Sequence, residues 1–320
     1  MDQPLWATAR TSAGGTQSRT RITARTTGSG RRVSFREHHY AAQDGLSLYY
    51  REYGAPERLG IPVLCLTGLT RNSRDFHRLA SRLCTGRRVI CPDYRGRGRS
   101  QYDANSANYQ PVTYLHDIRH LLAVTGIARV IVIGTSLGGV LAMAMSAMMP
   151  TALAGVVLND IGPDIDQSGL QRILDYISVD RPHADWTSAA KDLRVMFPSL
   201  SLQGDAQWEA AARATWREKD DGLLHFDWDV RVSQALADDS ELPDLWPMFG
   251  GLGRMPLLSI RGAISDVLSG QTVMAMATAH PGMKQVTVPD AGHVPSLGEP
   301  EAEGAIDAFI DAIDAAQSTH

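Results

Sequence analysis

The sequence predicts an α/β fold in which a mostly parallel central sheet has helices on both faces and carries a helical insertion. Three observations lead to this prediction. Short apolar runs alternate with helix-like segments between residues 62 and 158, the alternation stops over residues 163–245, and it resumes at residue 256. Fully apolar runs of this length are typical of strands that are covered on both faces.

The composition is that of a globular protein and excludes several classes. The 320 residues are 43% hydrophobic and 21% charged, and a net charge of -4 gives no sign of nucleic-acid binding. No apolar run approaches the roughly 20 residues of a membrane span. We therefore expect a soluble, cytoplasmic protein that binds neither nucleic acid nor membrane.

The chain has three cysteines, Cys65, Cys84 and Cys91. This small, odd number argues against a disulfide framework. We interpret them as small buried hydrophobic residues. The sequence contains no CxxC or HExxH spacing, so we expect neither a metal nor another cofactor.

Residues 1–33 differ from the rest of the chain. They are rich in Arg, Ser and Thr, contain one acidic residue, and show no apolar periodicity. Such a segment cannot bury a face, so we expect a disordered basic tail. The composition of residues 1–33 resembles that of an organelle transit peptide, but a solvated tail is the simpler interpretation. The segment lacks the apolar centre of a secretory signal.

The elements before the insertion follow from the apolar pattern. Asp44-Gly45 between two strand-like runs predicts a hairpin. The apolar runs and amphipathic segments predict strands at 36–42, 46–53, 62–66, 88–92, 130–133 and 153–158, and helices at 73–84, 112–125 and 137–149.

The insertion at 163–245 has helix-like segments around 168–179, 185–196 and 205–219 and no convincing parallel strand. The sheet pattern resumes with strands at 256–260 and 284–288 and helices at 268–279 and 300–315. We therefore expect a core of residues 34–162 and 246–320 with residues 163–245 as a helical cap.

Ser136 is the candidate nucleophile. It lies in Gly134-Thr135-Ser136-Leu137-Gly138-Gly139, directly between a predicted buried strand and a predicted helix. A serine on a sharp strand-to-helix turn is exposed at the edge of the sheet, and flanking glycines let strand and helix pack closely. A Gly-rich turn that only joins the two elements is the alternative.

A serine hydroxyl needs a base and an orienting carboxylate. His293 follows the last predicted strand, and Asp266 follows the strand before it, so both loops open on the same edge of a parallel sheet as Ser136. Asp160, at the end of strand 153–158, is the alternative acid. Either aspartate could instead cap a helix.

The negative charge that develops during acyl transfer needs two backbone donors. The N–H of Leu137, directly after the serine, is one candidate. The N–H of Leu69, in the loop Thr67-Gly68-Leu69 after strand 62–66, is the other.

The chain from about residue 33 to 313 resembles the α/β-hydrolase superfamily, in its capped esterase and lactonase branch. Four features carry the resemblance: Thr67-Gly68-Leu69, the run Asp93-Tyr94-Arg95-Gly96-Arg97-Gly98-Arg99-Ser100, the Ser136 turn, and Asp266 with His293. The resemblance implies a mainly structural role for the run at 93–100. Many members have His-Gly where this chain has Thr67-Gly68, so the outer hydrogen bonding of that loop is expected to differ.

These features predict a serine hydrolase that cleaves a small carboxylic ester or lactone without a cofactor. A C–C bond hydrolase of ring-fission products and a cofactor-free perhydrolase remain alternatives, as does a slow-turnover ligand receptor that keeps the triad. We expect a few of the cap's apolar side chains to wall an acyl pocket over Ser136, the candidates being Ile173, Leu174, Ile177, Trp186, Leu193, Phe197 and Trp208.

Overall fold

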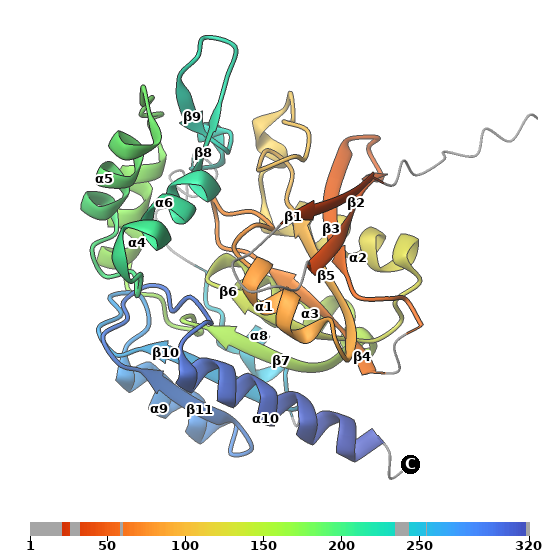
Figure 1. Cartoon of the computed structure of the whole chain (residues 1–320). Coiled ribbons are helices and arrows are strands. Elements are labelled where there is room, and N and C mark those ends of the chain that lie inside the picture. The colour runs from red at the N-terminus through yellow and green to blue at the C-terminus, as the bar shows by residue number, and fades with distance from the viewer. Residues whose placement is uncertain (1–20, 26–32, 58–59, 234–242, 254, 318–320) are drawn as a thin grey trace, which may run out of the picture.

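The computed structural model of the chain describes residues 21–25, 33–57, 60–233, 243–253 and 255–317. A nine-stranded sheet forms its centre, and the insertion stands beyond one end of the sheet (Figure 1). Within these ranges no helix has the length and apolarity that a membrane crossing needs. The same part of the chain has no cluster of three or more His, Cys, Asp or Glu side chains that could hold a metal ion.

The strand order is β1-β2-β3-β5-β4-β6-β7-β10-β11. The first three neighbouring pairs are antiparallel, and the five pairs from β5 to β11 are parallel. The prediction of a mostly parallel sheet is therefore confirmed. The strands are β1 (Arg21–Arg25), β2 (Val33–Ala41), β3 (Ser47–Tyr53), β4 (Gly60–Leu66), β5 (Arg87–Asp93), β6 (Val130–Thr135), β7 (Leu153–Asn159), β10 (Leu257–Gly262) and β11 (Lys284–Val288).

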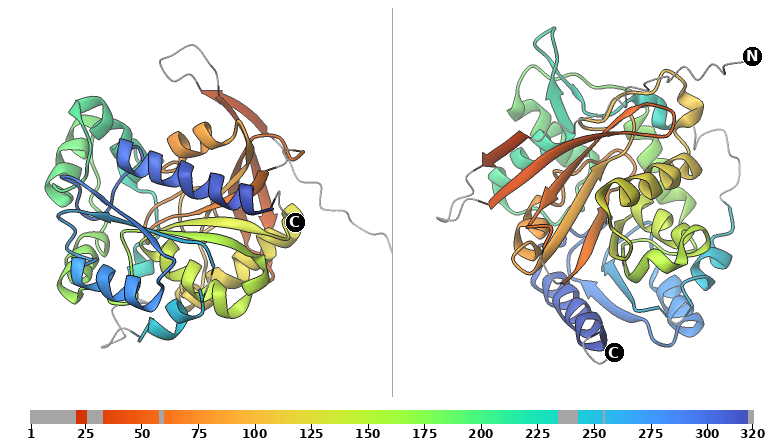
Figure 2. Two further views of the ribbon diagram at one scale, coloured as in Figure 1. Left: turned by 90° about the horizontal axis from the view of Figure 1, so that it is seen from below. Right: turned by 90° about the vertical axis from the view of Figure 1, so that its right-hand side faces the viewer.

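Helices cover both faces of the sheet (Figure 2). One face packs against α1 (His77–Leu83) and α10 (Pro300–Gln317). The other packs against α2 (Pro111–Thr125), α3 (Leu137–Met148), α8 (Trp246–Gly250) and α9 (Gly270–Ala279). Every residue of β6 and β7 is buried, because these central strands have a helix layer on each side.

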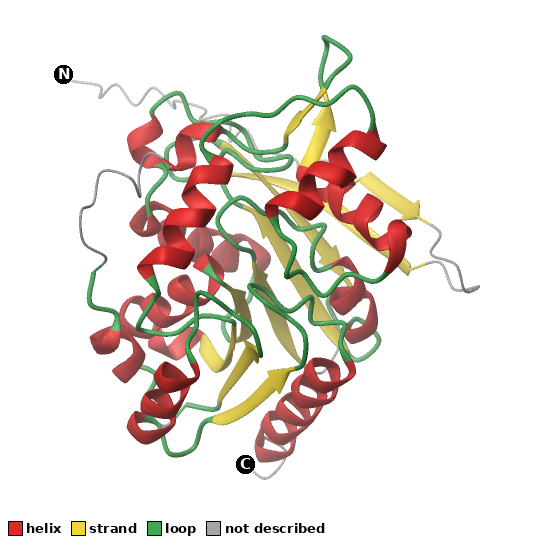
Figure 3. Cartoon of the chain, turned by 90° about the vertical axis from the view of Figure 1, so that its left-hand side faces the viewer, coloured by secondary structure: helices red, strands yellow, loops and turns green. Residues whose placement is uncertain are grey.

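The insertion leaves the carboxyl end of β7 and contains α4 (Gln167–Ile177), α5 (Trp186–Met196) and α6 (Gly204–Thr215). Figure 3 shows loops in the space between the sheet and these helices. The described residues also form short 3₁₀ helices at Ser106–Asn108, Pro150–Ala152 and Val230–Ser233.

The structure differs from the predicted helix over 205–219. Helix α6 ends at Thr215, and the hairpin strands β8 (Trp216–Glu218) and β9 (Leu224–Phe226) follow. The turn between them uses Gly222 at a φ of +77°, which glycine adopts without strain. Leu224, Phe226 and Trp228 are buried at every second position, and this period-two pattern was the overlooked strand signal.

The expectation of disorder throughout residues 1–33 is wrong for residues 21–25. These residues form β1, which pairs antiparallel with β2 from Arg21 opposite Glu37 to Arg25 opposite Val33. Backbone pairing to an exposed sheet edge does not require an apolar face, which explains why hydrophobic periodicity did not reveal this strand. Residues 1–20 and 26–32 lie outside the described residues.

Candidate active site

Ser136 stands at the junction between β6 and α3. Its φ of 51° lies in the left-handed region, which a non-glycine residue adopts only at a cost. A Cβ on Gly134 would overlap the carbonyl of Gly138, and a Cβ on Gly138 would overlap the carbonyl of Leu66. Glycines are therefore required where the turn is tightest, and the serine lies directly before the first turn of α3.

His293 faces Ser136 from the loop that follows β11. Its Nε2 lies 3.0 Å from Oγ of Ser136, and its Nδ1 lies 2.8 Å from Oδ2 of Asp160. An ionised carboxylate only accepts hydrogen bonds, so Nδ1 donates to Asp160. Nε2 then accepts from the Ser136 hydroxyl, which is the polarity that a general base needs.

Asp160 follows β7 and is fully buried. Besides His293, its carboxylate accepts hydrogen bonds from the N–H of Gly262 at 2.7 Å and from the hydroxyl of Ser265 at 2.6 Å. Its own N–H donates to the carbonyl of Ile260 at 2.7 Å. A buried carboxylate is costly unless it is paired and hydrogen-bonded, and these donors meet that need and fix its orientation.

The prediction of Asp266 as the carboxylate beside His293 is wrong, and the alternative, Asp160, occupies that place. The side chain of Asp266 is 42% exposed, and Nη2 of Arg172 in α4 lies 2.6 Å from its Oδ2. The turn after β10 directs Ser265 inward to Asp160, and the next side chain projects outward. Both aspartates follow neighbouring strands that end at one edge, so the sequence pattern could not separate them.

The N–H groups of Leu69 and Leu137, which the sequence suggested as oxyanion donors, both lie in segments next to Ser136. Leu137 is the first residue of α3, where a helix leaves its N–H groups without an internal acceptor. Over the part of the chain that the structure describes, neither N–H donates a hydrogen bond. A Cβ placed on Gly68, the residue before Leu69, would lie 3.8 Å from Cβ of Ser136, so this loop lies against the serine.

The run at residues 93–100 supports the Leu69 loop. The buried carboxylate of Asp93 accepts from the N–H of Ser73 at 2.7 Å and of Arg99 at 2.9 Å. Burial raises the pKa of Asp93 above its ordinary value, and these two donors oppose the rise. The fully buried Arg97 donates from Nε to the carbonyl of Leu69 at 2.8 Å. The run therefore fixes the backbone that carries the Leu69 N–H, one of the two candidate donors.

Thr67, at the carboxyl end of β4, holds this loop through a local hydrogen bond. Its hydroxyl donates to the carbonyl of Arg71 at 3.3 Å, and the N–H of Arg71 donates to the carbonyl of Gly68 at 3.2 Å. The Arg71 side chain forms a two-point ion pair with Asp75 and donates from Nη1 to the hydroxyl of Thr215 at 2.6 Å. Thr215 is the last residue of α6, so the hydrogen bond from Arg71 connects this loop to the insertion.

The insertion also contacts the loop that carries His293. The N–H of Gly292 donates to the carbonyl of Ser199 at 2.8 Å. A Cβ on Gly292 would overlap the side chain of Ser199, so only glycine allows this close approach. The segment between α5 and α6 therefore lies directly beside the histidine.

Sequence reasoning missed two residues that support the site. Ser265 stands directly before the aspartate that the sequence favoured, and nothing in the local pattern distinguishes its inward position. Arg71 stands in the loop that also contains Leu69, and nothing in the local pattern separates it from Arg74, three residues further on. Both act through contacts between segments far apart in the chain, which local periodicity does not report.

Comparison with known proteins places this geometry in a family. The model of the alpha/beta hydrolase family matches residues 63–305. A crystal structure of an alpha/beta hydrolase from Novosphingobium aromaticivorans is 40% identical with a TM-score of 0.81, covering 87% of this chain and 98% of that one.

Two of the curated relatives that match most of this chain are named for the reaction that they catalyse. A 3-hydroxybutyrate-oligomer hydrolase from Cupriavidus necator is 32% identical over 78% of this chain and 88% of its own length. A 2-(acetamidomethylene)succinate hydrolase from Mesorhizobium japonicum is 27% identical over 83% of this chain and 92% of its own length.

Proposed function

Because the chain belongs to the alpha/beta hydrolase family, we propose that it is a serine hydrolase that cleaves carboxylic esters through an acyl-enzyme on Ser136. The observation that carries this proposal is the continuous hydrogen-bonded path from Ser136 through His293 to Asp160. The two free N–H groups of Leu69 and Leu137 beside the serine support it further.

The first half-reaction forms the acyl-enzyme. Oγ of Ser136 attacks the ester carbonyl while Nε2 of His293 takes the hydroxyl proton. The N–H groups of Leu69 and Leu137 hold the oxyanion of the tetrahedral intermediate. Asp160 holds the imidazole in the required tautomer and stabilises its charged form. The C–O bond then breaks, and the leaving alcohol takes the proton from Nε2.

The second half-reaction repeats these roles with water. Nε2 of His293 accepts a proton from water as the oxygen attacks the acyl carbonyl. The second tetrahedral intermediate breaks at the Ser136 ester bond, and the serine recovers its proton from His293 as the carboxylic acid leaves. In this cycle each proton passes through Nε2 of His293, between Ser136, water and the leaving alcohol.

The substrate class that we propose is a short ester, with linear oligoesters of 3-hydroxy acids as the first candidates. The support is the 32% identity to the 3-hydroxybutyrate-oligomer hydrolase, which covers most of both chains. Such a substrate is hydrolysed at an ester between two hydroxy-acid units, which fits acyl transfer to a serine. The remaining length of the oligomer would lie under the insertion.

We propose that the insertion serves as the cap over this site. Of the apolar residues that the sequence suggested as pocket walls, Leu174, Ile177, Leu193 and Trp208 are buried in the main core, as packing residues are. The half-buried Leu200 is a better candidate, because it follows Ser199, whose carbonyl contacts the His293 loop. We expect Leu200 to help set the acyl length that fits.

Steady-state hydrolysis of 3-hydroxybutyrate dimer and trimer, of p-nitrophenyl esters from acetyl to decanoyl, and of a set of lactones tests this function. Ser136→Ala is expected to lower kcat by about 10⁵–10⁶ with the fold retained. Leu200→Ala is expected to shift the preferred acyl length, whereas Leu223→Ala, at the exposed hairpin tip, is the matched control.

Three results would count against the proposal. Turnover of Ser136→Ala above a few per cent of wild type would exclude the acyl-enzyme. Release of a single equivalent of product without further turnover would favour a receptor. Hydrolysis of C–C substrates, or perhydrolysis, in the absence of ester hydrolysis would favour those alternatives.

A further inference from the structure

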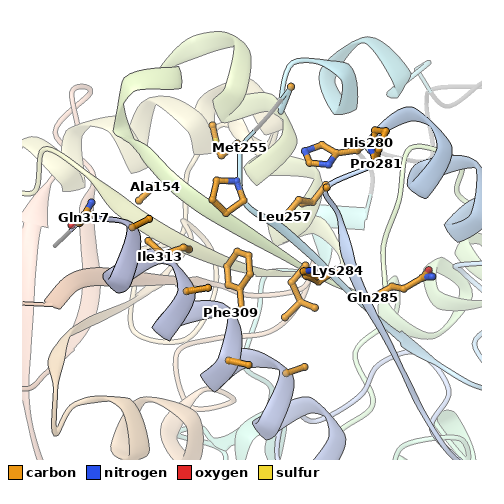
Figure 4. A pocket seen from close by; sticks show the side chains of 18 of the residues that line it. Ala154, Met255, Leu257, His280, Pro281, Lys284, Gln285, Phe309, Ile313 and Gln317 are labelled. Carbon is orange, nitrogen blue, oxygen red and sulfur yellow. The ribbon is translucent and has the colours of Figure 1, made fainter. Parts of the chain in front are cut away.

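A cavity lies at the end of the sheet opposite to Ser136. It is a groove of about 1170 Å³ between α10, the first residues of β7, β10 and β11, and the turn that joins α9 to β11 (Figure 4). Asp160 follows the carboxyl end of β7, and Ala154 at its amino end lines the groove. At about 3.3 Å per residue the strand separates the two sites by roughly 20 Å.

The groove exists because α10 presents small side chains to it. Ala305, Ala308, Ala312 and Ala316 recur at helical spacing along its wall. Phe309 and Ile313 continue the wall with larger apolar groups, and Met255 and Leu257 face them from the other side. This apolar trough has the shape and chemistry to accept an alkyl chain.

His280 is a buried polar group in the groove lining without a partner. The residue is 5% exposed, and neither of its ring nitrogens has a hydrogen-bond partner among the described residues. Figure 4 shows it on the opposite side of the groove from Phe309 and Ile313. A buried nitrogen without a hydrogen-bond partner is unfavourable, so a hydrogen-bonding ligand group would be favoured beside this ring.

The charges of the lining favour an anion. Among the described residues, the lining includes the cations Arg129 and Lys284 and no carboxylate side chain. Both cations are exposed, and neither forms an ion pair within the described part of the chain. By contrast, two acidic residues of α10, Asp307 and Asp314, pair with arginines outside this lining.

We propose that this groove binds a medium-chain fatty carboxylate. The alkyl chain lies along the alanine face of α10, and the carboxylate accepts hydrogen bonds from His280 and Lys284, with Arg129 adding to the positive field. This site is separate from the triad. Only the reagent that blocks Ser136 in the test relies on the proposed nucleophile, and the groove variants distinguish the two sites whether or not that reagent reacts.

Calorimetric titration of sodium decanoate into the full chain tests the proposal. Ser136 is first blocked with phenylmethylsulfonyl fluoride, so that binding at the triad does not contribute. We expect one decanoate to bind the blocked protein. Decyltrimethylammonium, which has the same chain and the opposite charge, is expected not to bind.

Three variants locate the ligand. Ala312→Trp places a large side chain in the trough at an exposed position and is expected to abolish binding. His280→Phe keeps the ring volume but removes both nitrogens, and Lys284→Glu reverses a rim charge. Each is expected to weaken binding at least fivefold, or about 1 kcal/mol. Lys219→Glu, an exposed charge reversal in the insertion, is the matched control.

The proposal is overturned if the blocked protein does not bind decanoate, or if the three groove variants bind it as wild type does. Equal binding of decanoate and decyltrimethylammonium would also overturn it, because the groove would then show no preference for an anion. Because Lys284 is exposed, its variant keeps the test informative even if a buried variant fails to fold.

Discussion

The hydroxyl of Ser265 donates a hydrogen bond of 2.6 Å to Oδ2 of Asp160, the same oxygen that accepts from Nδ1 of His293. The Ser265 oxygen in turn accepts from the N–H groups of Val267 and Leu268 at 3.2 and 3.1 Å. The loop after β10 therefore orients the carboxylate through a serine.

Ser265→Ala is expected to lower kcat about tenfold with KM changed less than about twofold, because Asp160 loses one of the groups that orient it. Ser265→Thr, which keeps the hydroxyl, should restore most of the loss. Ser259→Ala removes another buried serine hydroxyl, on β10 itself, and is the control. Equal kcat losses in the Ser259 and Ser265 variants would point to a general packing effect.

Asp160→Asn is expected to lower kcat by about 10⁴, because the amide favours the wrong tautomer of His293. Asp266→Asn breaks only the partly exposed pair with Arg172 and should change kcat less than about threefold and stability by at most about 1 kcal/mol. Steady-state kinetics and thermal unfolding of the two variants check this contrast. The reverse order of effects would make Asp266 the functional acid.

Arg71→Met is expected to lower kcat roughly tenfold, because it frees the loop that carries the Leu69 N–H from both Asp75 and Thr215. Thr215→Val removes the contact with Arg71, and the hydroxyl's own bond to the carbonyl of Ala211, but keeps the Arg71–Asp75 pair, so it should have a smaller effect in the same direction. Arg78→Met removes an exposed pair with Glu303 and serves as the control. Wild-type kcat in Arg71→Met would show that the loop holds its shape without the side chain.

The His225 imidazole joins two parts of the insertion and should make its stability depend on pH. Nδ1 lies 2.6 Å from Asp180 and Nε2 lies 2.8 Å from Asp221. The hydrogen bond to Asp180, followed by that to Asp221, raises the pKa of His225 above its ordinary value. A raised folded-state pKa means that the added stability is complete below about pH 6.5 and is lost as the pH rises through the folded-state value.

His225→Gln is therefore expected to lower Tm by about 2 °C at pH 6 and by less at pH 9. Thermal unfolding of wild type and variant at both pH values gives the difference in Tm between the two proteins. Groups that titrate in both proteins affect both Tm values equally and therefore do not contribute to this difference. His120→Gln, at a half-buried position on α2 outside the insertion, is the control. A Tm difference that is larger at pH 9 than at pH 6 would refute the assigned sign.

The sequence by itself determined the parallel core and the place of Ser136 and His293. Short unbroken apolar runs that alternate with helix-like segments are typical of strands covered on both faces, and a serine between such a strand and a helix stands at the sheet edge where the loop after β11 also opens. These are local or nearest-strand properties, so periodicity and turn residues are sufficient to predict them.

Only the tertiary structure decided which aspartate meets the histidine, because Asp160 and Asp266 follow adjacent strands at the same edge. The choice depends on side-chain direction within two turns, where hydrogen bonds to Gly262 and Ser265 turn Asp160 inward and Arg172 holds Asp266 outward. The hydrogen bond from Arg71 to Thr215 and the groove beside α10 were likewise decided by the tertiary structure. Each joins residues far apart in the chain, whose proximity depends on packing and leaves no periodic signal in the sequence.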